Sequence, residues 1–254
     1  MPSIMMKLKQ GTWPLHQQLE QSLDLLNPRF SVADYRRLIE AFWGYYQPLE
    51  AQLQAHQALR EWLPDLAQRA KWPLLETDLL VLGHAEVPPR LNVVELSSKV
   101  PSPHGNAVEL SLPAYQLVGR QPLAAETSRG FSRHGDADLL LNSTALPPQL
   151  PVCGDLPDCN SIAQAFGCLY VLEGATLGGQ VLCRHFNQTL GLDARNGSAF
   201  FSGYGEATGA MWALFGERLT AANVDETAAI SAACQTFQTL EQWLRPVIFW
   251  SGDT

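Results

Sequence analysis

The sequence predicts an all-α protein: a bundle of about six helices in two groups, divided by a long proline-rich segment. Apolar residues recur at spacings of three and four before residue 85 and again after residue 158, as on the buried face of amphipathic helices. No sustained alternation of apolar and polar residues predicts a sheet. With 254 residues, of which 46% are hydrophobic, the chain can bury one sizeable core. We therefore expect a single domain over residues 1–254.

The first helical pattern is predicted to begin at Thr12, because threonine can cap a helix and proline, here Pro14, is tolerated in a first turn. Its apolar stripe comprises Leu15, Leu19, Leu23 and Leu26.

A second helix is predicted to start after Ser31 and a shorter one to follow Pro73. Pro48 lies inside the second pattern, and its missing N–H predicts a kink or break there. The shorter apolar segment, Leu74–Leu82, stops at Gly83. The apolar positions of the second helix are Tyr35, Leu38, Phe42, Tyr45, Leu49 and Leu53.

Residues 86–151 differ from the rest of the chain. They hold nine of its 17 prolines and none of its seven tryptophans, and neither helical nor strand periodicity persists in them. Such a segment buries too little apolar surface to offset the entropy lost on ordering, so we expect a long loop or disordered insertion. Short strands, as in Leu91–Leu96, are a weaker alternative.

Helical periodicity resumes after Asp158 and recurs in two further stretches. The last of these begins near Asp225 and is predicted to end at Pro246. The apolar positions of these helices include Ile162, Phe166, Leu169, Leu172, Met211–Leu219, Ile230, Ala233, Phe237, Leu240 and Leu244.

Composition excludes several classes of partner. The formal net charge of −8 makes nucleic acid an unlikely ligand, because binding it requires a surplus of Lys and Arg. No run of about 18 apolar residues predicts a membrane span, and the N-terminus has no secretory signal. We expect a cytoplasmic protein whose five cysteines, an odd number, are free thiols.

One candidate site is centred on His16, which borders the apolar stripe of the first helix. Glu20 lies one turn further along the same side, and Lys9 about two turns before. A metal-bound imidazole usually gives its other N–H to a carboxylate, and Glu20 can supply one. On spacing alone, a surface His–Glu pair is the more common explanation.

A second candidate is the glycine-rich stretch Tyr170–Gln180. Gly174, Gly178 and Gly179 fall within an apolar helical pattern, although each glycine costs about 1 kcal/mol relative to alanine in a helix. Either the backbone must approach a flat or bulky group, or another helix packs tightly against this face. The residues alone leave both explanations open.

Together the two patterns resemble the heme oxygenases, most closely the bacterial type found alongside bacteriophytochromes. The first reads L-K-x-x-T-x-x-x-H-x-x-x-E, and L-E-G-A-T-L-G-G-Q follows about 160 residues later. The resemblance covers about residues 7–85 and 150–250, including Phe200–Phe215 and Thr236–Leu244.

The resemblance implies a role for each matching residue. His16 corresponds to the proximal ligand of the heme iron, Glu20 to the group that orients its free nitrogen, and Lys9 to a basic residue at the heme propionates. Gly174, Gly178 and Gly179 correspond to the catalytic distal glycines, which let the backbone approach the heme.

The implied reaction opens heme to biliverdin, carbon monoxide and ferrous iron. Heme is then both substrate and cofactor, and O2 is consumed. Electrons come from an external donor protein such as ferredoxin or a reductase, because no flavin or nicotinamide motif is present. The resemblance also implies a bacteriophytochrome as a partner that receives biliverdin as its chromophore.

One departure from the family concerns the distal side. Many members place an aspartate directly after the first distal glycine, where this chain has Ala175. Glu173 is adjacent but turned about 100° away on a helix, so it is no obvious substitute. Thr176, a backbone carbonyl or another arrangement of water would have to serve.

Alternative functions follow from particular residues. Ala175 favours a heme carrier or sensor that does not turn heme over, and a solvated His16 would favour a helical interaction module. A thiaminase-II-like enzyme of the same fold would need a nucleophilic cysteine, for which Cys168 and Cys183 are the candidates. His185 is the one rival to His16, and the remaining histidines are expected to be solvated: His56, His84, His104 and His134.

Overall fold

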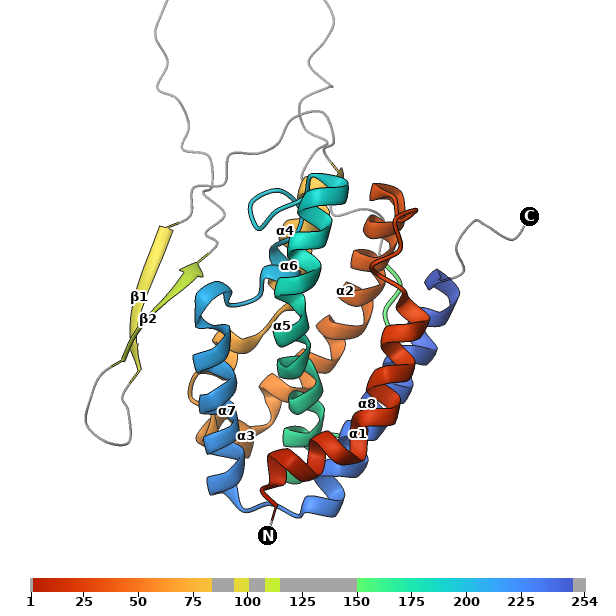
Figure 1. The fold of residues 1–254 in the computed structure, drawn as a ribbon. Helices are drawn as coiled ribbons and strands as arrows, with labels where there is room; N and C mark the ends of the chain where they lie inside the picture. The colour runs from red at the N-terminus through yellow and green to blue at the C-terminus, as the bar shows by residue number, and fades with distance from the viewer. Residues whose placement is uncertain (1, 84–93, 101–107, 115–149, 249–254) are drawn as a thin grey trace, which may run out of the picture.

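The computed structural model describes residues 2–83, 94–100, 108–114 and 150–248. In this part of the chain eight α-helices form a bundle, and two strands form a hairpin outside it (Figure 1). Six of these helices have twelve or more residues, which confirms the all-α class and the predicted number. In chain order the elements are α1 (Ile4–Leu23), α2 (Val32–Ala55), α3 (Gln57–Trp62), η1 (Leu66–Arg69), α4 (Trp72–Gly83), β1 (Val94–Val100), β2 (Val108–Ala114), α5 (Ile162–Leu190), α6 (Ala199–Ser202), η2 (Gly205–Ala207), α7 (Thr208–Ala222) and α8 (Glu226–Ile248).

The helix α1 begins two turns earlier than the sequence predicts. Its cap is Ser3, whose hydroxyl accepts the Met6 N–H at 3.3 Å, so the prediction that Thr12 caps the helix is wrong. Ile4 and Leu8 are buried where α1 packs against α7 and α8, and they extend the apolar stripe of Leu15 and Leu19 toward the N-terminus. Pro14 therefore lies inside the helix.

The apolar stripe of α1 is shorter than predicted at its C-terminal end. Leu19 and Leu23 are buried and Leu15 is half-buried, but Leu26 lies beyond the helix and is 55% exposed.

The helix α2 starts where predicted and does not break at Pro48. Ser31 and Asp34 form a capping box: the Ser31 hydroxyl accepts the Asp34 N–H at 3.2 Å, and the Asp34 carboxylate accepts the Ser31 N–H at 2.9 Å. Burial of Tyr45 and Leu49 on either side of Pro48 holds the helix together despite the missing hydrogen bond.

The C-terminal helices follow the predicted pattern closely. The helix α5 begins with a second capping box, made by Ser161 and Gln164, and ends at Gly191, whose φ of 71° is left-handed. The prediction that Pro246 ends the last helix is wrong by two residues, because α8 continues to Ile248.

The predicted loop over residues 86–151 contains regular structure. The strands β1 and β2 pair antiparallel, from Val94 opposite Ala114 to Val100 opposite Val108. Local pairing across a short connection stabilises this hairpin without helical periodicity. Residues 84–93, 101–107 and 115–149 lie outside the described part, so the expected disorder of the insertion stays a prediction there.

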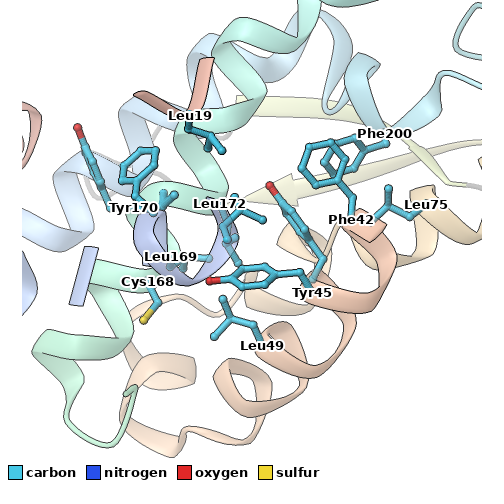
Figure 2. Close-up of a cluster of buried hydrophobic side chains, with 14 of the residues drawn as sticks. Leu19, Phe42, Tyr45, Leu49, Leu75, Cys168, Leu169, Tyr170, Leu172 and Phe200 are labelled. Atoms are coloured by element: carbon cyan, nitrogen blue, oxygen red, sulfur yellow. The ribbon is translucent and has the colours of Figure 1, made fainter. Parts of the chain in front are cut away.

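The core is built from apolar side chains of all eight helices, with large contributions from α2, α5 and α8. Figure 2 shows Leu169 and Leu172 of α5 among Tyr45 and Leu49 of α2, with Leu19 of α1 nearby. The five cysteines are free thiols, and three of them are buried: Cys153, Cys159 and Cys168.

The helix α5 is long and apolar enough to cross a membrane by length and composition alone. Half of its most apolar window is buried inside the bundle, as in the central helix of a folded domain.

Two helices cross α8 at close range through glycines. A Cβ at Gly11 of α1 would lie 2.8 Å from Cγ2 of Ile230, and one at Gly167 of α5 would lie 2.2 Å from the Ala229 carbonyl oxygen. Adjacent residues of α8 therefore hold α1 and α5, and the bundle requires bare backbone at both crossings.

We expect Gly167→Ala to lower the free energy of unfolding by about 1–3 kcal/mol, because a backbone oxygen cannot rotate away from the added methyl. The matched control is Gly209→Ala in α7, where a Cβ meets no described atom within 4 Å. This control should raise stability by up to about 1 kcal/mol. Urea unfolding followed by circular dichroism measures both, and equal stability of the two variants would contradict the close crossing.

Candidate functional site

The His16 imidazole is held between two aromatic rings on one side of the bundle. Trp13 stacks on it at a centroid distance of 5.8 Å and an angle of 12°, and Phe237 of α8 meets it edge-on at 5.7 Å. The side chain is 42% exposed, so His16 borders solvent without projecting into it.

The two nitrogens of His16 have different surroundings. Nδ1 is buried, and Oε2 of Glu20 is 3.5 Å away without hydrogen-bonding geometry. No group in the described part of the chain makes a hydrogen bond to either nitrogen. An imidazole with Nδ1 toward a carboxylate and Nε2 free of protein partners is arranged to bind a metal through Nε2.

Lys9 lies on the same helix, about two turns before His16. It is exposed and makes no ion pair with the described residues, whereas the neighbouring Lys7 pairs with Glu226 of α8. Lys9 is therefore the free cation at this end of α1.

The histidine and the glycine-rich stretch occupy corresponding levels of two adjacent helices. The Tyr170 phenol of α5 lies near the Thr12 side chain of α1: burial raises the pKa of the phenol overall, and Thr12 acts to lower it. His16 is one turn beyond Thr12, and Gly174 is one turn beyond Tyr170, while α1 and α5 rise in the same direction (Figure 1). The chain thus brings together two motifs that are about 160 residues apart.

Beyond Gly174, one face of α5 is apolar and exposed. Leu177 is 45% exposed and Val181 is 51% exposed, and a Cβ at Gly178 would meet no described atom within 4 Å. On α1, Trp13 is 46% exposed. Exposed apolar side chains therefore occur on both helices, at Trp13 of α1 and one to two turns beyond Gly174 on α5.

The glycines do not all serve the same purpose. A Cβ at Gly179 would lie 2.3 Å from the carbonyl oxygen of Phe201, so the packing of α6 requires this glycine. A Cβ at Gly174 would make only ordinary contacts with Trp212, at 3.8 Å. Protein packing therefore accounts for Gly179 and leaves Gly174 and Gly178 unexplained.

No aspartate follows Gly174, and the residues around that position are either apolar or already hydrogen-bonded to other protein groups. Ala175 is exposed, and the Thr176 hydroxyl donates to the Glu173 carbonyl at 2.7 Å. The Glu173 carboxylate is 1% exposed and accepts hydrogen bonds from Arg69 at 2.6 Å and Tyr204 at 2.7 Å. Glu173 is thus fixed in the core and does not reach the glycine face.

The structure also describes two further histidines, His56 and His185, and the candidate nucleophile Cys168. His56 caps α3 by accepting the Leu59 N–H at 3.2 Å. His84, His104 and His134 lie outside the described residues. His185 is half-buried against Phe186, with Nε2 unpaired among the described groups. Burial raises the pKa of the Cys168 thiol to about 12, which makes it a poor nucleophile for a thiaminase-like reaction.

A separate cleft of about 810 Å³ lies between α2, α8 and the chain before α5. It borders none of the residues singled out from the sequence; its lining includes Ala41, Cys153 and Trp243. Among the described residues, no group of three or more His, Cys, Asp and Glu side chains could hold a metal ion. A metal bound by His16 would therefore need most of its ligands from a prosthetic group and not from these side chains.

Sequence reasoning missed the aromatic contacts of His16 and the partners of Glu173. Trp13 could have been found, because it is three residues before His16 and therefore one turn away. Phe237, Arg69 and Tyr204 are far from these residues in sequence, and no local pattern predicts that they meet.

The structure thus defines an all-helical bundle with a half-exposed histidine on α1 and a glycine-containing, exposed apolar face on α5, two helices that both pack against α8. The sequence profile of the heme oxygenases matches residues 3–83 and 143–246, and the chain belongs to the heme oxygenase family.

A solved structure of similar fold is the NO- and CO-bound heme oxygenase from Neisseria meningitidis. The two chains align with a TM-score of 0.62 and 18% identity, over 100% of this chain and 96% of that one. At this identity the likeness shows the fold alone. A search of curated protein sequences found no match.

We expect Gly179→Ala to destabilise the ligand-free protein by about 1–3 kcal/mol, because the new methyl would clash with the backbone of Phe201. Gly178→Ala should leave the free energy of unfolding unchanged or raise it by up to about 1 kcal/mol. Chemical denaturation without added heme compares the two variants. A large loss of stability in Gly178→Ala would show that protein packing also explains this glycine.

Asp78 of α4 gives a prediction about pH. Its carboxylate accepts the N–H groups of Ala199 and Phe200 at 2.7 and 2.9 Å, at the start of α6. Burial nevertheless raises the pKa of Asp78 from 3.8 to about 7, so the folded state binds this proton more tightly than the unfolded state. The wild-type protein should lose stability relative to Asp78→Asn as the pH rises from 3.8 to about 7, and no further above that.

Urea unfolding of both proteins between pH 4 and pH 8 measures this difference. A difference that stays constant with pH would contradict the raised pKa of Asp78.

Proposed function

We propose that this protein is a heme oxygenase that opens heme to biliverdin, carbon monoxide and ferrous iron. The observation that carries the proposal is the His16 imidazole, which is oriented by two rings, faces Glu20 through Nδ1 and lies level with Gly174. Membership of the heme oxygenase family supports it.

The residues present fit a heme. His16 would bind the iron through Nε2, and Glu20 would orient the ring through Nδ1, where a buried atom lacks a hydrogen-bond partner. Lys9 is free to pair with a propionate. The exposed apolar face of α5 would cover the macrocycle, and Gly174 and Gly178 would let the backbone lie close to it. Gly179 would act indirectly, by holding α5 against α6.

When bound, heme supplies an iron that can take up dioxygen, and the polarity of the distal side decides whether the oxygen is activated. The protein would contribute the His16 imidazole as proximal ligand, bare backbone at Gly174 and Gly178, and the apolar side chains of Leu177 and Val181, which would limit the access of water. Electrons would come from a separate ferredoxin or reductase in the cytoplasm, and a bacteriophytochrome would receive the biliverdin.

A non-catalytic heme carrier or sensor is the second candidate. Ala175 favours it, because the distal aspartate of many family members is missing and Glu173 is fixed elsewhere. Single-turnover absorption spectra separate the two functions. With ascorbate or reduced ferredoxin, an oxygenase converts the Soret band to the broad band of biliverdin, whereas a carrier keeps its Soret band.

We expect His16→Ala to abolish the Soret shift seen on hemin titration of the wild-type protein, because the iron loses its proximal ligand. His185→Ala is the matched control and should bind hemin as the wild type does. Absorption titration measures both, and imidazole added to His16→Ala should restore the band. Loss of the band in His185→Ala alone would assign the ligand to the other histidine.

A further inference from the structure

A buried ionic cluster holds α5 directly beside the glycine-rich stretch. Glu173 accepts hydrogen bonds from Arg69, Lys71 and Tyr204, and the two cations are 0% and 2% exposed. Lys71 also donates to the Tyr204 hydroxyl at 2.9 Å and to the Arg69 carbonyl at 2.6 Å. The carboxylate at this point of α5 is therefore fixed from three directions.

The cluster ties α5 to distant parts of the bundle. Arg69 pairs with Asp65 of the η1 region at 2.8 Å. Glu50 of α2 accepts the backbone N–H groups of Lys71 and Trp72, each at 2.9 Å, where α4 begins. Burial lowers the pKa of Arg69, but Glu173 and Asp65 outweigh this effect and raise it, so the guanidinium stays charged. Elements from both halves of the chain thus meet at one carboxylate.

The position of Glu173 on its helix suggests what the cluster does. Glu173 immediately precedes Gly174, and its side chain points about 100° away from the glycine face. That face has no side chains at Gly174 and Gly178. Side-chain packing on this face therefore does little to fix the position of the α5 backbone there. The ionic contacts lie on the opposite, buried side at the same level.

We propose that Glu173 is the positioning residue for the distal helix, holding the backbone of Gly174 and Gly178 at a fixed distance from a heme bound by His16. This inference rests on the proposed function. Ion pairs suit the task better than apolar contacts, because charge-assisted hydrogen bonds have narrow distances and directions. Buried ion pairs add little net stability, and fixing geometry is a recognised reason to retain them.

The test is the variant Glu173→Gln, loaded with hemin, reduced and exposed to carbon monoxide. The C–O stretching frequency of this complex responds to the polar groups on the distal side. We expect Glu173→Gln to shift or split this band and to lower kcat by up to about 100-fold, as small misplacements do. The Kd for hemin should change less than about threefold, because His16 is untouched.

Glu50→Gln is the matched control, since Glu50 is an equally buried carboxylate of the same cluster whose hydrogen bonds go to the Lys71 and Trp72 N–H groups and not to α5. It should alter stability while leaving the C–O band at the wild-type frequency. If Glu173→Gln does not fold, the double variant Glu173→Gln/Lys71→Met carries the test, because it removes one charge of each sign and leaves Arg69 paired with Asp65. The double variant should fold and still show the shifted band.

A wild-type frequency and kcat in Glu173→Gln or in the double variant would overturn the positioning role. An equal shift in Glu50→Gln would also overturn it, because the effect would then belong to general loosening of the core. If the wild-type protein itself gave no Soret band with hemin, the proposed function would fail, and the positioning role with it.

Discussion

The crossing of α1 and α5 on adjacent residues of α8 is the constraint on which the candidate site depends. At Gly11 the backbone of α1 lies against the side chain of Ile230, and at Gly167 the backbone of α5 lies against the backbone of Ala229, so both helices approach α8 closely. Tyr170 of α5 lies near Thr12 of α1, so these two residues mark the same level of the two helices. His16 and Gly174 lie one turn further along their helices, where each presents a half-exposed surface. The close packing of α1 and α5 on α8 thus determines where His16 and Gly174 lie relative to each other.

Polar groups are distributed unequally around the candidate site. On the α1 side a single imidazole has no hydrogen-bond partner among the described groups, and its neighbours are Trp13 and Phe237. Behind α5, by contrast, Glu173 is satisfied by two cations and a phenol. The histidine is therefore left available to an incoming metal, whereas the carboxylate is committed to the protein. This division explains why the glutamate next to Gly174 does not replace the absent aspartate.

Local pattern predicted the helices well where burial follows periodicity, and it also identified Ser31 as the cap of α2; the Ser161 cap of α5 was not predicted. It failed where tertiary packing overrides local signals. The first turns of α1 form because Ile4 and Leu8 are buried on α8, and α2 continues through Pro48 because its flanking residues are buried. The hairpin was only the weaker prediction: β1 overlaps the strand considered at Leu91–Leu96, but no sustained alternation of apolar and polar residues marked either strand.

By itself, the sequence determined the all-α class, the order of the main helices and the two motifs that match the heme oxygenase family, since spacing and residue type are local properties. Only the tertiary structure decided that packing against Phe201 accounts for Gly179 and that Trp13 and Phe237 clamp His16. It also decided that Arg69, Lys71 and Tyr204 converge on Glu173. Such contacts join residues up to about 220 positions apart, and they exist only once the helices have packed.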